Sequence, residues 1–498
     1  MVRRAALTGA ALGALAVAAA SCSLILGIPS DRYLVDGGAA HDAAADRSVD
    51  AGCEVPDGFP GSSCVNCAPQ DPTQVLNACT GGQCTPFDNY HRIPGFDGGV
   101  RPLPADSGSV ITDGGVPNPS DGGTVLCSKL PSPVYLYGST TLDQVMWKLA
   151  QAIPSTSATV IKGKNVSCNA LDAVASNFPA TKMTGLGQYW LPADQTGAGH
   201  YCTLDDGGVT PDVAVSDVYP ESCYPNSMGL DNIGDFPAQV QTYMFIVPNK
   251  SDQYAISAEA AYEVYGLGKA SGVAPWTQGT TALRPAGSGH ELVLSACIGL
   301  PASRWMGDVV LAGDKMVPTV TGYPDPNAAL GITSADIADN QRDKVRTLAF
   351  QARGQRCAFT PDSEPGAHDK RNVRDGHYFL WAPVHFYTRV DGNGVPIKPA
   401  VGQVIDYLTG AQPLPPSSNL DVITAFKQAG LIPRCAMKVT RQREGGPLLP
   451  YTARPSCGCA FEKADPATGT SNNCVPCKVP GDCPPATPAC NFGYCEPQ

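Results

Sequence analysis

One short stretch of the chain combines residue types that suit the binding of an oxyanion. It reads Arg284-Pro-Ala-Gly-Ser-Gly-His290 and runs directly into the apolar segment 291–300, which has the character of a helix. The first N–H groups of a helix have no partner within it and carry partial positive charge, so they attract anions. A nearby guanidinium adds a planar fork of donors that fits a tetrahedral oxyanion. The candidate anion contacts here are Arg284, Ser288, Gly289 and His290.

Three further segments have related chemistry. Segment 138–141, Gly-Ser-Thr-Thr, and segment 165–167, Asn-Val-Ser, each precede a helical pattern. Ser and Thr cap helix starts, and their hydroxyls can also donate to an anion. Segment 212–217, Asp-Val-Ala-Val-Ser-Asp, is a short apolar strand that ends in a carboxylate. Helix capping alone explains each hydroxyl cluster, so the case rests on their combination. The candidate contacts are Thr140, Thr141, Ser167 and Asp217.

Hydrophobic periodicity predicts the elements that position these segments. Apolar residues at helical spacing predict helices over 142–153, 170–175, 258–265 and 401–408. Runs rich in β-branched and aromatic residues predict strands at 134–137, 158–161, 243–247, 378–381 and 385–387. Strands that alternate with helices are typical of an α/β domain with mainly parallel strands, and a domain of this length should divide into two lobes.

Composition divides the chain further. We expect a signal segment at 1–22, a linker at 23–52, a Cys-rich module at 53–90, an Asp/Gly/Pro-rich linker at 91–127, a binding domain at 128–456 and a second Cys-rich module at 457–498. The linker compositions bury too little apolar surface to offset the entropy of ordering. In the binding domain we expect lobe one at 128–245 and 380–456, lobe two at 246–376, and hinge crossings near 245–248 and 377–381.

The N-terminus has the features of an export signal. Arg3 and Arg4 precede an apolar run over 5–20, which ends in small residues before Cys22. Cys22 resembles the lipidated cysteine of a bacterial lipobox; ordinary signal cleavage nearby is the alternative. We therefore expect an exported protein of the cell envelope, anchored to a membrane through a lipid on Cys22.

The 20 cysteines fit this location, because exported proteins form disulfides. An internal repeat supports the same reading: Cys64-Val-Asn-Cys67 and Cys474-Val-Pro-Cys477 are each followed by the pattern A-C-x4-C-x-P. Paired C-x2-C spacing also suits zinc, but an oxidising compartment favours disulfides. The connectivity stays open, and lipidation of Cys22 would leave an odd number, with one cysteine free or paired between molecules.

Charge and motif content exclude several functions. The net charge of −11 argues against nucleic acid as a partner. The chain has no H-E-x-x-H, P-loop or nucleophile elbow, and its 7 histidines form no persuasive metal cluster. We therefore expect no enzymatic activity, no cofactor and no metal. Hydrolysis of phosphoesters is the enzymatic alternative that stays open.

In their order and chemistry the four segments resemble the phosphate-binding protein family of ABC transporters, a branch of the type II periplasmic binding proteins. That family reads G-x-T-F, G-S-S-G, D-F-G-A-S-D and R-x-x-G-S-G-T at the corresponding places. The resemblance covers roughly residues 130 to 455, and segments 212–217 and 284–290 are its specific part. It implies a two-lobed α/β fold with a hinge, an oxyanion bound between the lobes, and an ABC permease as a partner.

The resemblance also implies a role for each candidate residue. Asp217 would accept a hydrogen bond from protonated phosphate, which would exclude sulfate because sulfate has no proton to offer at neutral pH. The implied donors are Thr140, Thr141, Ser167, Arg284, Ser288, Gly289 and His290.

The chain departs from the family pattern at several positions. Thr141 stands in place of a phenylalanine, and His290 in place of a threonine, which predicts an affinity that changes near the histidine pKa. Cys168 and Asn169 break the G-S-S-G pattern. A long insertion then follows, with Cys168 and Cys223 near its ends, which suggests a disulfide-stapled flap over the cleft. A second hypothesis therefore stays open: a surface interaction or adhesion lipoprotein that keeps the fold but has lost or changed its ligand.

Overall fold

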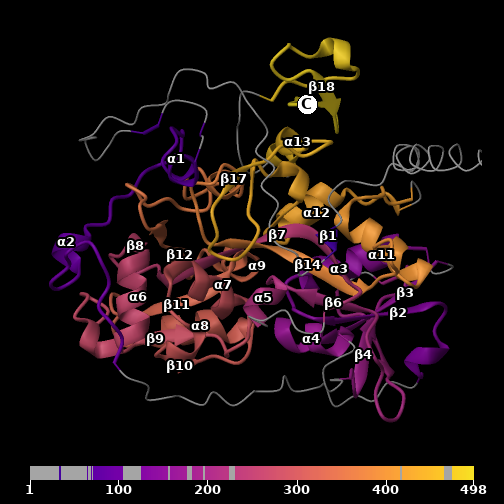
Figure 1. Ribbon diagram of the computed structural model, residues 1–498, viewed down its shortest axis with the longest axis horizontal. Helices are drawn as coiled ribbons and strands as arrows, with labels where there is room; N and C mark the ends of the chain where they lie inside the picture. Colours follow the sequence, from indigo (N-terminus) through magenta and orange to yellow (C-terminus); the bar gives the residue numbers. More distant parts are fainter. Residues whose placement is uncertain are drawn as a thin grey trace, which may run out of the picture.

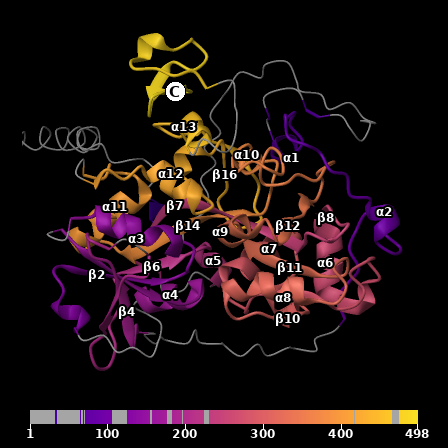
Figure 2. The same ribbon diagram turned by 180° about the vertical axis from the view of Figure 1, so that it is seen from behind.

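The structure is a computed structural model that describes residues 64–65, 69, 71–104, 125–154, 157–175, 182–194, 197–223, 230–415, 418–464 and 474–498, and the backbone of the strand β1 (Tyr33–Leu34). Cys22 and the signal segment lie outside the described residues. Two α/β lobes lie side by side, and the C-terminal module projects above them, beyond α13 (Figures 1 and 2). No helix in the described ranges is long and apolar enough to cross a membrane.

The first lobe is built on three parallel strands covered by helices on both faces. These strands are β3 (Thr159–Lys164), β2 (Pro133–Gly138) and β6 (Val213–Ser216), side by side in that order. Val134 and Leu136 pack against helices α3 (Asp143–Ala152), α11 (Pro399–Thr409) and α12 (Val422–Gln428). Tyr135 and Tyr137 point to the other face, toward α4 (Ser167–Val174). This period of two is the pattern of a strand buried on both faces.

The insertion between α4 and β6 adds to the edge of this sheet. It contains β4 (Leu186–Tyr189) and β5 (His200–Thr203), which form an antiparallel pair beside β3. A disulfide joins Cys168 to Cys223, which confirms the staple across the insertion, and a second joins Cys202 to Cys127. The insertion therefore extends the lobe as part of its sheet.

A single long strand, β7 (Ile233–Pro248), belongs to both lobes. Its first part, 233–242, pairs with β14 (Trp381–Arg389), which in turn pairs with β6. Its last part pairs with β11 (Leu330–Ser334) and β12 (Val345–Thr347) of the second lobe. All these pairings are antiparallel, so the expectation of mainly parallel strands is wrong: the strands that cross between the lobes run against their neighbours.

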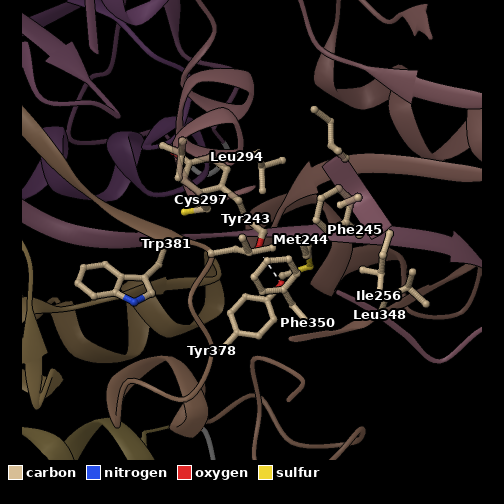
Figure 3. Close-up of a cluster of buried hydrophobic side chains, with 14 of the residues drawn as sticks. Tyr243, Met244, Phe245, Ile256, Leu294, Cys297, Leu348, Phe350, Tyr378 and Trp381 are labelled. Carbon is tan, nitrogen blue, oxygen red and sulfur yellow. Dashed lines mark hydrogen bonds between the residues drawn. The ribbon is translucent and has the colours of Figure 1, made fainter. Parts of the chain in front are cut away.

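The second lobe continues the sheet from β7. Strands β11, β9 (Thr281–Leu283) and β10 (Asp308–Val309) are parallel. Its main helices are α6 (Ala258–Leu267), α7 (Gly289–Ile298), α8 (Met316–Gly322) and α9 (Ala335–Ala338). Its core surrounds β7, with Tyr243 and Phe245 against Phe350 and Tyr378 (Figure 3). Phe350 lies on β13 (Ala349–Gln351), beside β8 (Ala255–Ser257).

The chain crosses between the lobes a third time. Strand β15 (Leu431–Ile432) pairs with β7, and the chain beyond it joins the core of the second lobe through Ala436, Met437 and Phe461. Phe461 lies on α13 (Gly458–Lys463). The expected first lobe at 380–456 is therefore wrong after β15, because the apolar side chains of that segment are buried against the second lobe.

The N-terminal Cys-rich part also packs on the second lobe. It contains α1 (Pro72–Leu76) and α2 (Asn89–Arg92), and a disulfide joins Cys84 to Cys357. Ile93 is buried in the second-lobe core, and Arg101 forms an ion pair with the buried Glu263. Residues 91–104, expected to be linker, therefore lie against this lobe.

The C-terminal module ends in a hairpin of β18 (Ala489–Asn491) and β19 (Tyr494–Glu496). The remaining short elements are α5 (Pro220–Cys223), α10 (Arg371–Arg374), β16 (Val439–Thr440), β17 (Leu449–Pro450) and 3-10 turns at 127–129, 268–271, 302–304, 313–315, 339–341, 434–436 and 480–482.

The described cysteines confirm the disulfide expectation. Besides the three bridges already named, they form the pairs Cys64–Cys79, Cys435–Cys457, Cys459–Cys474, Cys477–Cys490 and Cys483–Cys495. Among the described residues Cys297 is free, and it is buried. The sulfurs of Cys477, Cys483 and Cys490 lie close together, but all three are in disulfides and offer no thiolate to zinc.

Candidate functional site

The candidate site is centred on Asp217, which directly follows β6 and is 2% exposed. Ser139 Oγ donates a hydrogen bond to its Oδ2 at 2.6 Å, and Thr141 Oγ1 donates to its Oδ1 at 2.8 Å. The backbone N–H of Asp217 donates to Ser167 Oγ, at the start of α4, at 3.1 Å. The ends of two strands and the start of one helix therefore meet at Asp217, with the strand ends at its carboxylate and the helix start at its backbone N–H.

A close approach between β2 and β6 creates this arrangement. Gly138, at the end of β2, has φ +132°, and a Cβ there would lie 2.2 Å from the carbonyl oxygen of Val215. Only glycine fits such a contact. The next N–H, from Ser139, donates to the same carbonyl at 2.9 Å. The buried Lys162 holds the turn from the other side, because its Nζ donates to the Ser139 carbonyl at 2.7 Å.

Ser139 takes the position that the sequence had suggested for Thr140. Ser139 and Thr141 are buried and face Asp217, whereas Thr140 between them is exposed. Residues 139–141 lie in the turn between β2 and α3, and this turn places the hydroxyls of Ser139 and Thr141 on Asp217. Composition does not distinguish Ser139 from Thr140, because both are small hydroxyl residues.

The second lobe meets Asp217 with the first turn of α7. Ser288 caps this helix by accepting a hydrogen bond from the Glu291 N–H at 3.4 Å. A Cβ on Gly289 would lie 2.5 Å from Asp217 Cβ and 2.6 Å from Oδ2, so the glycine backbone packs directly on the carboxylate. The structure thus brings Ser288 and Gly289 of one lobe to Asp217 of the other, with the lobes closed on each other.

Burial raises the pKa of the Asp217 carboxyl, and the hydrogen bonds from Ser139 and Thr141 partly oppose that rise. A carboxylate held in a dry site favours a proton-bearing partner, because a shared proton removes the cost of burying a bare charge. Asp217 is therefore suited to accept a hydrogen bond from a protonated ligand or to carry a proton itself.

Arg284 lies near His290 and Asp336 and forms no bond to Asp217. It follows β9, is half-buried, and donates from Nη1 to the Val310 carbonyl at 2.6 Å. Its Nε is buried and has no hydrogen-bond partner among the described residues. The guanidinium still acts at a distance, since its charge helps to lower the pKa of His290.

His290 is neutral at physiological pH. Burial, followed by the charge of Arg284, lowers its pKa to about 3. Its Nε2 lies 2.9 Å from Ser334 Oγ, and its ring meets the ring of Tyr243 edge-on at 5.2 Å. The expected pH sensitivity near an ordinary histidine pKa is therefore wrong, because the ring is desolvated and next to a cation.

A polar chain extends from His290 across the junction of the lobes. The Ser334 hydroxyl donates to Asp336, whose Oδ1 also accepts from Gln241 Nε2 at 2.8 Å. Gln144, on α3 of the first lobe, donates to the Asp336 carbonyl at 2.6 Å. Burial raises the pKa of Asp336 to about 6, and the charge of Asp217 adds to the rise. Asp336 and Gln144 lie in no recognisable sequence motif, so only the structure identifies them.

Comparison with known proteins yields structural similarity alone. No known protein family and no curated protein sequence matches the chain. It is similar to the solved structure of a putative phosphate ABC transporter substrate-binding protein with bound phosphate from Clostridium perfringens, at 12% identity and a TM-score of 0.40, covering 61% of this chain and 99% of the other. An ABC-type phosphate transport receptor from Vibrio cholerae is similar at 15% identity and a TM-score of 0.40, covering 61% and 100%. PstS from Borrelia burgdorferi follows at 12% identity and a TM-score of 0.34, covering 61% and 98%. At these values no residue role transfers between the chains.

Proposed function

We propose that this protein is an exported solute-binding protein that captures phosphate or a related oxyanion between its lobes, for uptake or for sensing. The observation that carries the proposal is the convergence on Asp217 of the starts of α4 and α7, two helix ends that favour anions. The proposed ligand contacts are Ser139, Thr141, Ser167, Asp217, Arg284, Ser288, Gly289 and His290, with the buried Ser139 in place of the exposed Thr140. A lipid on Cys22 as the anchor and an ABC permease as the partner are parts of the same proposal.

The closed arrangement suggests how an anion would be accepted. The hydroxyl protons of Ser139 and Thr141 point to Asp217, and Gly289 packs against the same carboxylate. When the lobes part, these hydroxyls can turn from Asp217 to the oxygen atoms of an anion. Asp217 can then accept a hydrogen bond from the protonated ligand, which selects phosphate over sulfate. Closure buries the ligand between the lobes.

The same contacts favour a second candidate function. Ser139, Thr141 and Gly289 together occupy the surroundings of Asp217 within the protein itself. A surface interaction or adhesion protein that keeps the fold without a ligand would have such a self-satisfied site. The Cys-rich modules on both sides of the lobes agree with that role as well.

Calorimetric titration of the full chain, first with phosphate and then with sulfate, separates the two candidates. We expect phosphate to bind tightly and sulfate weakly. Arg284→Ala should weaken phosphate binding by roughly 10- to 100-fold, the equivalent of one charged hydrogen bond. Arg353→Ala is the control, because Arg353 also donates to a backbone carbonyl, that of Ile298, but does so from an exposed position on the second lobe.

Two results would contradict the proposal of oxyanion capture. One is the absence of both heat and thermal stabilisation with either anion, since a ligand that binds only the native state must stabilise it. The other is equal loss of binding in Arg284→Ala and Arg353→Ala, which would indicate a general effect on the second lobe. The first result favours the interaction protein.

A further inference from the structure

A cavity of about 1410 Å³, separate from Asp217, lies between the first lobe and the chain that follows β15. The beginning of β7, the loop after α11, the start of α12 and the segment 451–455 line it. Phe492, between the two strands of the C-terminal hairpin, also lines it. Its walls include several aromatic and proline residues, among them Phe236, Tyr451 and Phe492. A cavity of this size and character is larger than most small-ligand sites and suits an apolar stretch of chain.

The cavity lies along one edge of β7. Strand β14 pairs with the opposite edge over 233–242. On the cavity side, β1 pairs with Gly234 and Asp235, and β15 pairs with Val240 and Gln241. The residues between these two pairings include Phe236, Pro237 and Gln239, and these three line the cavity.

The register of β1 points toward this cavity. The strand is antiparallel, with Tyr33 opposite Asp235 and Leu34 opposite Gly234. A chain that continued this register before Tyr33 would run along 236–239. At about 3.3 Å per residue, four residues in extended form would cover that length of edge before the pairing with β15. The run Leu24-Ile-Leu-Gly-Ile28 comes immediately before residues 29–32 and is strongly apolar.

We propose that this cavity is the docking site of the chain's own segment 24–32, with the apolar side chains of 24–28 inside it. The proposal rests on the direction of β1, the composition of the segment and the character of the cavity walls. Covalent continuity favours this occupant over any other molecule, since a tethered segment is present at a high effective concentration. The proposed contact fixes the N-terminal tether to the first lobe, whatever the site at Asp217 binds.

Limited trypsin digestion of the full chain tests the proposal. One trypsin site lies within segment 24–32, and a second site outside it serves as the control. Arg32 lies next to the paired strand, and Arg47 lies farther along the same N-terminal segment. We expect cleavage after Arg32 to be slower than cleavage after Arg47 by roughly tenfold or more, since a protease cuts only the undocked form.

Two variants identify the cavity as the cause. The double change Leu26→Asp/Ile28→Asp should bring cleavage at Arg32 to the rate at Arg47, whereas Val49→Asp, the same type of change outside the proposed contact, should not. The second variant changes the cavity itself. Ala411 is exposed and lines the cavity, so the fold should tolerate Ala411→Trp. The larger side chain should occupy part of the cavity and raise the rate of cleavage after Arg32.

Either of two results would overturn the proposal. Equal cleavage at Arg32 and Arg47 in the unaltered protein would show that the segment does not dock. Slow cleavage at Arg32 that persists in both the Leu26→Asp/Ile28→Asp and the Ala411→Trp variants would show that backbone pairing alone protects it, and that another occupant fills the cavity.

Discussion

At the scale of single residues, Asp217 shows what residue types and spacing can reveal. The segments 212–217 and 284–290 were predicted to meet, and the structure places Gly289 directly against Asp217. The choice between Ser139 and Thr140 could not be predicted from composition, because both are small hydroxyl residues and only the turn at Gly138 decides which one is buried. The neutral state of His290 also required the structure, since a pKa depends on burial and on neighbouring charge.

Glu291, in the first turn of α7, should make the stability of the protein depend on pH. It is fully buried, neither carboxylate oxygen has a hydrogen-bond partner among the residues that the structure describes, and burial raises its pKa to about 8. The folded protein therefore holds a proton between the ordinary glutamate pKa and 8 that the unfolded chain releases. The free energy of unfolding falls as the pH rises through this window.

The variant Glu291→Gln should remove that fall. We expect little difference from the unaltered protein near pH 4, and a higher free energy of unfolding near pH 9 by on the order of a few kcal/mol. Denaturant unfolding across this range measures it. Glu259→Gln makes the same change in the first turn of α6, where the side chain is half-buried, and should leave the slope unaltered. If the free energy of unfolding changed equally with pH in all three proteins, Glu291 would not be the cause of its fall.

At the scale of elements, local pattern predicted the helices better than the strands. Helix α3 begins and ends within one residue of the predicted 142–153, because its apolar spacing is regular. For β7, only the end at 243–247 was predicted. Its first part contains Gly234, Asp235 and Pro237, which disfavour a strand locally, and it forms because β14 pairs along it. Pairing between residues far apart in the chain leaves no local signal.

Because α7 packs closely on Asp217, adding one methyl group at Gly289 should change the closure of the lobes. In Gly289→Ala the Cβ would overlap the Asp217 carboxylate, so the lobes should no longer close fully. We expect the free energy of unfolding to fall by about 1–3 kcal/mol, and small-angle scattering to show a larger radius of gyration. Gly322→Ala, at the end of α8, is the control, because a Cβ there meets nothing within 4 Å. An unchanged radius in Gly289→Ala would contradict the close contact.

At the scale of the whole molecule, the use of disulfides was predictable and their pairing was not. An exported chain rich in cysteine predicts covalent staples, yet Cys84 pairs with Cys357 at a sequence separation of 273. Only the packing of the N-terminal part on the second lobe brings them together. The same long-range packing places Phe461 in that lobe rather than in a separate module. Composition locates such segments but does not show where they dock.

The Cys84–Cys357 bridge means that the backbone can be cut without dividing the molecule. A specific protease site inserted in the Asp- and Gly-rich stretch 105–124 should yield two pieces that migrate as one band on a denaturing gel without reductant. With reductant, or in Cys84→Ala without it, the pieces should separate. If the two pieces of the cleaved protein separated without reductant while both cysteines were present, this pairing would be contradicted. In an oxidising compartment, a single proteolytic cut in this stretch would therefore release no fragment, and the cleaved protein would keep its full mass until a thiol reduced the disulfide.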